Sequence, residues 1–218
     1  MAHSSPDGYT LLLFDPAAAI NATLYQKLNF NFIRDIAPII CIFRTPFVIV
    51  VNPAVPAQTL PEFIAYAKAN PGKINMASAG NGTSSQLAGE LFKELAGVDM
   101  THIPFRGGGP AITNLLGGQV NIFFSPMAIA IAHIQAGKLR ALAVTSETRS
   151  DALPEVPAVH EFVQAMRRLT GLVLGRPKKL PPRSSTSSTM KSTLAWRTPR
   201  CRRGSQNWAR HGGRRLVG

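Results

Sequence analysis

The sequence INMASAGNGTSSQLAGELFKELAG, residues 74–97, joins a β-rich run to an apolar-periodic run through a loop of glycines and hydroxyl side chains. Ile74–Ala79 predicts a strand, because it is a short apolar run that ends at turn residues. The apolar spacing after Ser84 predicts a helix, with Thr83 among its possible N-caps. A strand followed directly by a helix is the repeating unit of α/β folds, so this stretch indicates the fold class.

The same alternation continues on both sides of this stretch. Two continuous apolar runs, Asp35–Phe43 and Phe47–Pro53, predict two separate strands buried on both faces, which favours a mostly parallel sheet. Thr59–Lys73 predicts a helix with Thr59 as its cap and with Pro61 and Glu62 in its first turn. Further strands are expected at Asp7–Phe14, Met100–Phe105, Val120–Pro126 and Leu139–Ser146, and further helices at Asn21–Leu28, after Arg106 and at Met127–Gly137.

Three strand-to-helix junctions, Ser78–Ser85, Phe105–Pro110 and Phe124–Met127, lie where open α/β sheets bind ligands, beyond the carboxyl ends of strands. At the first junction the N–H groups of a helix N-terminus can attract an anion. The alternative is a plain N-cap without a ligand. GNGTSS matches only two glycines of the dinucleotide fingerprint, and the chain contains neither a P-loop lysine nor a nucleophile elbow. Nucleotide binding and serine hydrolysis are therefore not indicated.

The basic residues are concentrated at one end of the chain. Residues 1–163 contain ten Lys and Arg against eleven Asp and Glu, a net charge of −1, whereas residues 164–218 contain fourteen basic residues and no acid. The Ser, Thr, Arg, Pro and Gly content of residues 164–218 predicts disorder. Fourteen unopposed positive charges attract polyanions. One candidate function, kept as the alternative to the one given below, is therefore that of a cytosolic protein that binds nucleic acid or other polyanions through this tail.

Other broad classes are not indicated. No run approaches the roughly 18 apolar residues of a membrane helix, and no charged-then-apolar leader follows Met1. Cys41 and Cys201 have the spacing of neither a metal site nor a disulfide framework.

Residues 5–162 resemble the substrate-binding proteins of tripartite tricarboxylate transporters, the Bug-type periplasmic solute receptors. The motifs that carry the resemblance are SPDGYTLL, LPEFIAYAKANPGKINMASAGNGTSSQLAGELFKELAGVDMTHIPFRGGGPAITNLLGGQVNIFF, HIQAGKLRALAVTSETRS and ALPEVPAVHEF, in the order and spacing of the family. The resemblance implies an α/β, periplasmic-binding-protein-like fold of two domains with a ligand cleft between them. It implies binding of a small carboxylate solute, such as a di- or tricarboxylate or an acidic amino acid, and delivery of that solute to membrane permease subunits. It implies no catalytic residue, cofactor, metal or specific nucleic acid.

The resemblance also suggests domain boundaries. Residues 1–44 correspond to a remnant of the first domain, 45–146 to a second, ligand-binding domain, 147–163 to a return segment and 164–218 to the basic tail. Compared with the family, the signal peptide and an opening strand-helix-strand unit are missing, so we expect a cytoplasmic chain if Met1 is the true start. After Val163 a one-base shift of reading frame can restore acidic, helix-forming sequence, and we infer a frameshift there. An incomplete first domain predicts impaired closure around the ligand.

The resemblance places ligand-binding walls at the three junctions. The candidate ligand-binding residues are Ser78, Gly80, Asn81, Gly82, Thr83 and Ser84 of the first junction, Phe105, Gly107 and Gly108 of the second, Ser125 of the third, and Asp15 of the first-domain remnant.

Several alternatives stay open at these positions. Arg106 pairs with a carboxylate or is simply solvated. Ser125, where many relatives carry an acid, alters the preferred solute or only caps the following helix. Asp15 reaches the ligand or belongs to a plain turn. His102 and His133 lack partners at metal spacing and are expected to be structural or solvated.

Overall fold

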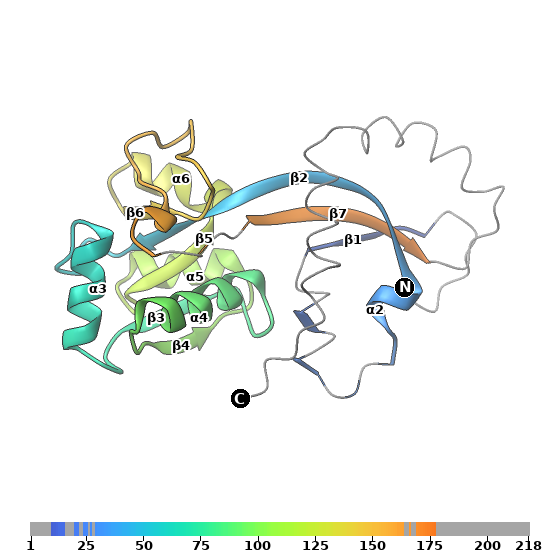
Figure 1. Ribbon diagram of the computed structural model, residues 1–218, viewed down its shortest axis with the longest axis horizontal. Coiled ribbons are helices and arrows are strands. Elements are labelled where there is room, and N and C mark those ends of the chain that lie inside the picture. Colours follow the sequence, from blue (N-terminus) through green and yellow to red (C-terminus); the bar gives the residue numbers. More distant parts are fainter. Residues whose placement is uncertain are drawn as a thin grey trace. The chain divides into compact units, whose positions relative to one another are not determined.

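A computed structural model describes residues 10–15, 20–21, 24–25, 27, 29–163, 166 and 169–177. The chain divides into two compact units, which are described separately below (Figure 1). Unit 1 consists of Met1–Phe43 together with Leu172–Gly218, and unit 2 consists of Arg44–Gly171.

Unit 2 is built on a mixed sheet. Its strands are β2 (Ile36–Val51, from Arg44 onward), β3 (Asn75–Ser78), β4 (Thr101–Pro104), β5 (Ile122–Pro126) and β6 (Arg140–Val144), in the order β6-β2-β5-β3-β4. β3 is parallel to β4 and β5, whereas β2 is antiparallel to both β5 and β6. The expectation of a mostly parallel sheet is therefore wrong. Phe47–Val51 of β2 and Ile122–Phe124 of β5 are buried because helices cover both faces of the sheet, and this burial does not depend on strand direction.

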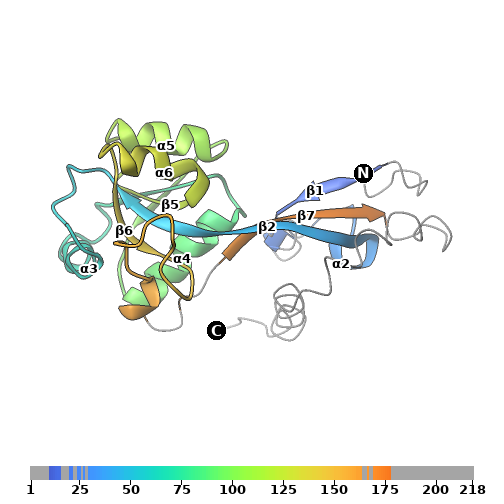
Figure 2. The ribbon, with the colours of Figure 1, turned by 90° about the horizontal axis from the view of Figure 1, so that it is seen from above.

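Helices pack on both faces of this sheet. β2 alternates between them, with Phe47, Ile49 and Val51 in one hydrophobic cluster and Val48 and Val50 in the other. The first cluster includes buried side chains of α3 (Leu60–Ala69) and α4 (Ser84–Ala96), and the second includes those of α5 (Gly108–Leu116) and α6 (Met127–Gln135). Figure 2 shows α5 and α6 above the strands of this unit and α3 and α4 below them. Unit 2 is thus a three-layer α/β/α structure.

The expectation of two separate strands at Asp35–Phe43 and Phe47–Pro53 is also wrong. β2 runs as one strand through the Arg44-Thr45-Pro46 segment, which lies between the two predicted strands. Proline fixes φ near a value that is compatible with extended backbone, so Pro46 removes an N–H donor without ending the strand. Next to it, Phe47 N–H donates to Thr145 Oγ1 at 3.0 Å.

The predicted helices of unit 2 are confirmed, and local signals explain their ends. Thr59 Oγ1 accepts from the Glu62 N–H at 3.4 Å, so Thr59 is the N-cap of α3. Thr83 is the N-cap of α4, and Gly97 ends that helix with a left-handed φ of 63°. These boundaries depend on neighbouring residues alone, which is why the sequence predicts them. After β6 the chain forms the short 3-10 helix η1 (Val159–Glu161).

Unit 1 contains β1 (Leu12–Phe14), α2 (Phe32–Asp35), the first part of β2, and β7 (Leu169–Pro177) from Leu172 onward. β7 lies between β1 and β2 in the strand order, and it pairs with β1 in antiparallel register. The rings of Phe14 and Phe32 pack edge to face with centroids 4.9 Å apart.

Two expectations from the sequence concern residues of unit 1, namely disorder at 164–218 and a helix at 21–28. The strand β7 differs from the disorder expected for residues 164–218, because LTGLVLG supplies a short β-prone run that can pair with β1. Residues 178–218 lie outside the described residues. Residues 22, 23, 26 and 28 of the helix predicted at 21–28 also lie outside them, although Tyr25 N–H donates to the Asn21 carbonyl at the spacing of a helix, 3.1 Å.

Candidate functional site

The three junctions meet at one edge of the unit 2 sheet. β3, β4 and β5 run parallel to one another, so their carboxyl ends share an edge, and each strand leads directly into a helix there. The loops therefore come together as the sequence predicts. We refer to the segments 78–85, 105–110 and 124–127 as the first, second and third loop.

The first and second loops are bonded to each other through their backbones. Phe105 N–H donates to the Ser78 carbonyl at 3.0 Å, and Gly107 N–H donates to the Ala79 carbonyl, also at 3.0 Å. Gly80 has a φ of 132°, and a Cβ at that position would lie 3.1 Å from the Phe105 carbonyl oxygen. Only glycine suits both that conformation and that approach.

Side chains cap the helix that follows the first loop. Gln86 N–H donates to Thr83 Oγ1 at 3.5 Å, and the Thr83 hydroxyl donates to the Gly80 carbonyl at 2.6 Å. Ser85 Oγ accepts from the Ala79 N–H at 2.9 Å. Among the described residues, the backbone N–H groups of Ser84 and Ser85 have no acceptor, and the buried Ser84 hydroxyl has no partner. The N-terminus of α4 therefore keeps unpaired donors beside a fixed loop.

The helices after the second and third loops begin differently. Gly107 and Pro126 occupy the N-cap positions of α5 and α6, and neither offers a side-chain hydrogen bond. A Cβ on Gly108 would lie 2.6 Å from Ile129 Cδ1 of α6, so the absence of a side chain lets the two helices approach. The first turns of α5 and α6 thus present backbone without side-chain caps.

A histidine lies behind the first loop. His102 Nε2 is 2.6 Å from Ser78 Oγ, and its Nδ1 is 3.4 Å from Gln86 Nε2. Burial lowers the pKa of His102 from its usual value of 6.5; Lys93 acts in the same direction, and Glu90 acts against it. His102 is expected from the sequence to be structural or solvated, and the structure shows it half-buried and hydrogen-bonded to the loop.

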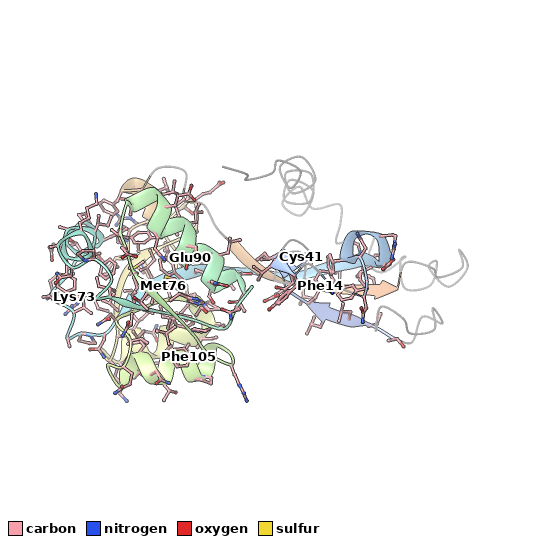
Figure 3. The ribbon with its side chains drawn as sticks, turned by 90° about the horizontal axis from the view of Figure 1, so that it is seen from below. Phe14, Cys41, Lys73, Met76, Glu90 and Phe105 are labelled. Atoms are coloured by element: carbon pink, nitrogen blue, oxygen red, sulfur yellow. The ribbon has the colours of Figure 1, made fainter. Side chains whose placement is uncertain are left out.

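Figure 3 places the two sides of this region. Met76 of β3 lies in the cluster beneath α4, the helix that carries Glu90, whereas Phe105 packs against the cluster on the α5 and α6 side.

The predicted site residues are not equally available. Asn81 is exposed, and Phe105, Gly107 and Gly108 are partly buried. Ser78 and Ser125 are fully buried, and the Ser125 hydroxyl donates to the Pro126 carbonyl at 3.1 Å. Contact of Ser125 with a solute stays a prediction, as does that of Asp15, which follows β1 in unit 1. Arg106 is exposed, which agrees with the solvated alternative.

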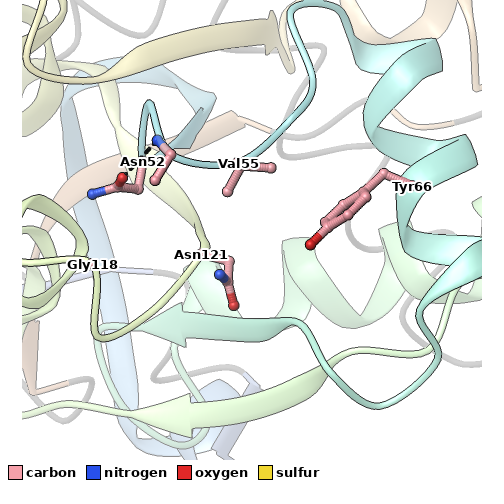
Figure 4. Close-up of a pocket in the computed structure, with 6 residues that line it drawn as sticks. Asn52, Val55, Tyr66, Gly118 and Asn121 are labelled. Atoms are coloured by element: carbon pink, nitrogen blue, oxygen red, sulfur yellow. Dashed lines mark hydrogen bonds between the residues drawn. The ribbon is translucent and has the colours of Figure 1, made fainter.

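A small cavity lies at the opposite edge of the sheet. It has a volume of about 80 Å³ and is lined by Asn52, Ala54, Val55, Tyr66, Gly118 and Asn121 (Figure 4). Asn52 follows β2 and Asn121 precedes β5, so the cavity is at the end of β5 away from the three loops. Asn52 Nδ2 donates to the Leu115 carbonyl at 2.7 Å, and Asn121 Oδ1 accepts from the Asn75 N–H at 2.8 Å. Both amides thus support the surrounding backbone.

Within the described ranges, no group of three or more His, Cys, Asp or Glu side chains is placed to hold a metal ion. The helices of that same part of the chain are too short or too polar to cross a membrane.

Comparisons with known proteins agree with this architecture. The model of the tripartite tricarboxylate transporter family receptor matches residues 1–204. Protein BugT of Bordetella pertussis is 37% identical over 163 residues, which are 74% of this chain and 50% of BugT. The chain thus spans about half the length of the curated relatives it matches.

Two solved structures are also similar. R. palustris Rpa4515 with adipate has a TM-score of 0.84 and 25% identity, covering 96% of this chain and 75% of that protein. MatC of Rhodopseudomonas palustris with bound malate has a TM-score of 0.80 and 26% identity, covering 92% of this chain and 69% of that protein.

Proposed function

The chain belongs to the tripartite tricarboxylate transporter receptor family, and from that premise we propose that it binds a small carboxylate at the three loops of unit 2. Members of the family are periplasmic solute-binding receptors and not enzymes. The proposed activity is accordingly recognition of a solute without chemical conversion. The candidate ligands are dicarboxylates, tricarboxylates and acidic amino acids.

The observation that carries the proposal is the convergence of unpaired backbone donors at one edge of the sheet. The first-turn N–H groups of α4, at Ser84 and Ser85, have no acceptor among the described residues. Gly107 places the uncapped start of α5 beside them, because its N–H is bonded to Ala79 of the first loop. Each helix N-terminus favours a nearby anion by about 0.3–1 kcal/mol, and two termini at one edge suit a carboxylate better than one.

The ligands of similar structures support the solute class. One similar protein was solved with adipate and another with malate. Both are dicarboxylates, and they differ in chain length and in the hydroxyl group that malate carries. We propose a dicarboxylate as the first solute to test on this chain.

A nuclear magnetic resonance titration of the ¹⁵N-labelled chain tests the proposal. Adipate and malate are expected to shift the amide signals of Ser84 and Ser85, whose N–H groups have no acceptor among the described residues, and of Gly109 in the first turn of α5. Adipamide, which has the length of adipate without its charge, is the matched control and should leave them unchanged. Shifts at Gly118 and Asn121 instead would place the solute in the cavity at the opposite edge and overturn the proposed site.

We also propose that the complete receptor works in the periplasm and passes its solute to membrane permease subunits. The family assignment supports this part of the proposal, and pull-down of the permease subunits by the solute-loaded receptor tests it. Recovery of those subunits only when solute is present is the expected result. Recovery that is the same without solute would contradict delivery of the bound solute.

A further inference from the structure

The side chains of Ser78, His102 and Gln86 form one hydrogen-bond network behind the first loop. His102 Nε2 lies 2.6 Å from Ser78 Oγ, and Gln86 Nε2 lies 3.4 Å from His102 Nδ1. The other end of the Gln86 amide, Oε1, accepts from the Gly82 N–H at 2.7 Å. Ser78 Oγ in turn accepts from the Gly80 N–H at 3.1 Å and lies 3.2 Å from the Gly80 carbonyl. The imidazole is therefore connected to the loop backbone at two points, Gly80 and Gly82.

One arrangement of protons satisfies every hydrogen bond in this network of Ser78, His102 and Gln86. Because Gln86 Oε1 accepts from Gly82, the other amide atom is a donor and His102 Nδ1 must accept. A neutral imidazole that accepts at Nδ1 carries its proton on Nε2, which donates to Ser78 Oγ. The Ser78 hydroxyl then donates to the Gly80 carbonyl. The opposite tautomer would set an N–H of His102 against the amide N–H of Gln86.

Protonation of His102 conflicts with this arrangement. An imidazolium donates from both nitrogens, so Nδ1–H would face the Gln86 amide donor. Turning the Gln86 amide over would restore that contact, but it would point an N–H group at the Gly82 N–H and lose the 2.7 Å bond. Without that turn, the contact between His102 and Gln86 is lost; with it, the bond between Gln86 and Gly82 is lost. In both cases protonation breaks the connection between His102 and Gly82.

We propose that His102 is a positioning residue for the solute loop: its neutral Nε2–H form fixes Gly80 through Ser78 and Gly82 through Gln86, and protonation releases Gly82. The functional meaning of the proposal rests on the carboxylate site proposed above, whereas the coupling of His102 to Gly82 is a property of the chain without solute. The solute is not expected to touch the imidazole.

The surroundings favour the neutral ring near neutral pH. Burial lowers the pKa of His102, as described above. The charged groups that act on the ring are Glu90 and Lys93 of α4, which pair with each other at 3.0 Å. The neighbouring positions on β3, Met76 and Ser78, carry no charge. Release of Gly82 is accordingly expected only as the pH falls below 6.5.

Nuclear magnetic resonance of the free chain tests the coupling directly. The ring signals of His102 and the amide signal of Gly82 are expected to titrate with one shared midpoint below pH 6.5. In Gln86→Glu, a carboxylate can accept from both Gly82 N–H and the protonated Nδ1–H, so the midpoint should move to higher pH. His133→Gln is the matched control, since His133 lies on α6, and it should leave the midpoint unchanged. A Gly82 amide that does not follow His102 would overturn the proposal, whatever the outcome with solutes.

Adipate affinity as a function of pH then tests the consequence for binding. From pH 7.5 to 5 the wild-type affinity should fall about three- to tenfold more than that of His102→Gln, the size expected for one lost hydrogen bond. Both proteins experience the same protonation of adipate itself, which cancels in this comparison. An imidazolium near an anion would by itself strengthen binding, so affinity that rises at low pH only in the wild type would contradict the positioning role. If adipate and malate bind neither protein at pH 7.5, the proposed function fails, and the Gly82 titration still decides the role of His102.

Discussion

The first and second loops fulfil the same structural task in different ways. Both connect a strand of the parallel part of the sheet to a helix, yet the first is held by side chains and the second by backbone. Thr83, Ser85 and Gln86 fix the first loop through their own hydrogen bonds. The second loop has no side-chain cap and is positioned through Gly107 N–H on the first loop.

This difference indicates that the two loops contribute different properties to the proposed solute site. The first loop is the rigid member, because removing any one side chain leaves a bonded backbone group without its partner. The second loop contributes open glycine backbone: a Cβ on Gly109 would meet no atom within 4 Å. We therefore expect substitutions in the first loop to affect stability and those in the second loop to affect binding.

Gly80→Ala should give the largest effect. The φ of 132° is strongly unfavourable for alanine, and its Cβ would lie 3.1 Å from the Phe105 carbonyl oxygen. We expect the free energy of unfolding to fall by about 2–3 kcal/mol in urea denaturation. Gly137→Ala is the control, because Gly137 has a φ of 68° with no atom within 4 Å, and it should cost about 1 kcal/mol. Equal losses in the two variants would mean that contact between the loops adds nothing.

Ser78→Ala should come next. The variant leaves Gly80 N–H and His102 without the hydroxyl that joins them, at a fully buried position. The expected loss of unfolding free energy is about 2 kcal/mol, measured by thermal and urea unfolding. Ser146→Ala removes a hydroxyl whose one hydrogen bond among the described residues goes to the exposed Thr148 carbonyl, and it should change stability by less than about 0.5 kcal/mol. A similar small change for Ser78→Ala would argue against the rigid first loop.

Thr83→Ala and Thr59→Ala together compare the side-chain N-caps of α4 and α3. Loss of an N-cap hydroxyl costs about 1 kcal/mol, and Thr59→Ala at the start of α3 should show that value in chemical denaturation. Thr83 should cost more than Thr59, because its hydroxyl also donates to the Gly80 carbonyl at 2.6 Å. A smaller loss at Thr83 would show that the cap of α4 is not tied to the loop.

Gly109→Ala should have the smallest effect on folding and the opposite sign. Gly109 lies in the first turn of α5 with open space around its Cβ position, so alanine should raise the free energy of unfolding by about 0.5 kcal/mol. The added methyl group stands at the proposed solute site and should weaken adipate binding in calorimetric titration. Unchanged affinity in this more stable variant would remove the second loop from the site.

Much of this architecture could be predicted from the sequence, because the signals are local. Thr59 and Thr83 cap helices through residues three positions away, and the glycines of the junctions specify turns at the positions where they stand. The three junctions follow parallel strands, so their convergence at one edge could also be predicted. In contrast, the Ser125 hydroxyl is buried because β5 is covered on both faces, and no local pattern at Phe124–Met127 indicates that.

The sequence by itself determined the helices of unit 2 and the strands β3 to β6, since helix caps, apolar periodicity and glycine turns act over a few residues. The tertiary structure alone decided that β2 is one strand running antiparallel to β5, because strand direction depends on pairing between distant segments. It also decided the role of His102, which lies 24 positions beyond Ser78 and meets it only when β3 and β4 pair. The physical reason is the same in both cases: a hydrogen bond between distant residues exists only after the sheet has formed.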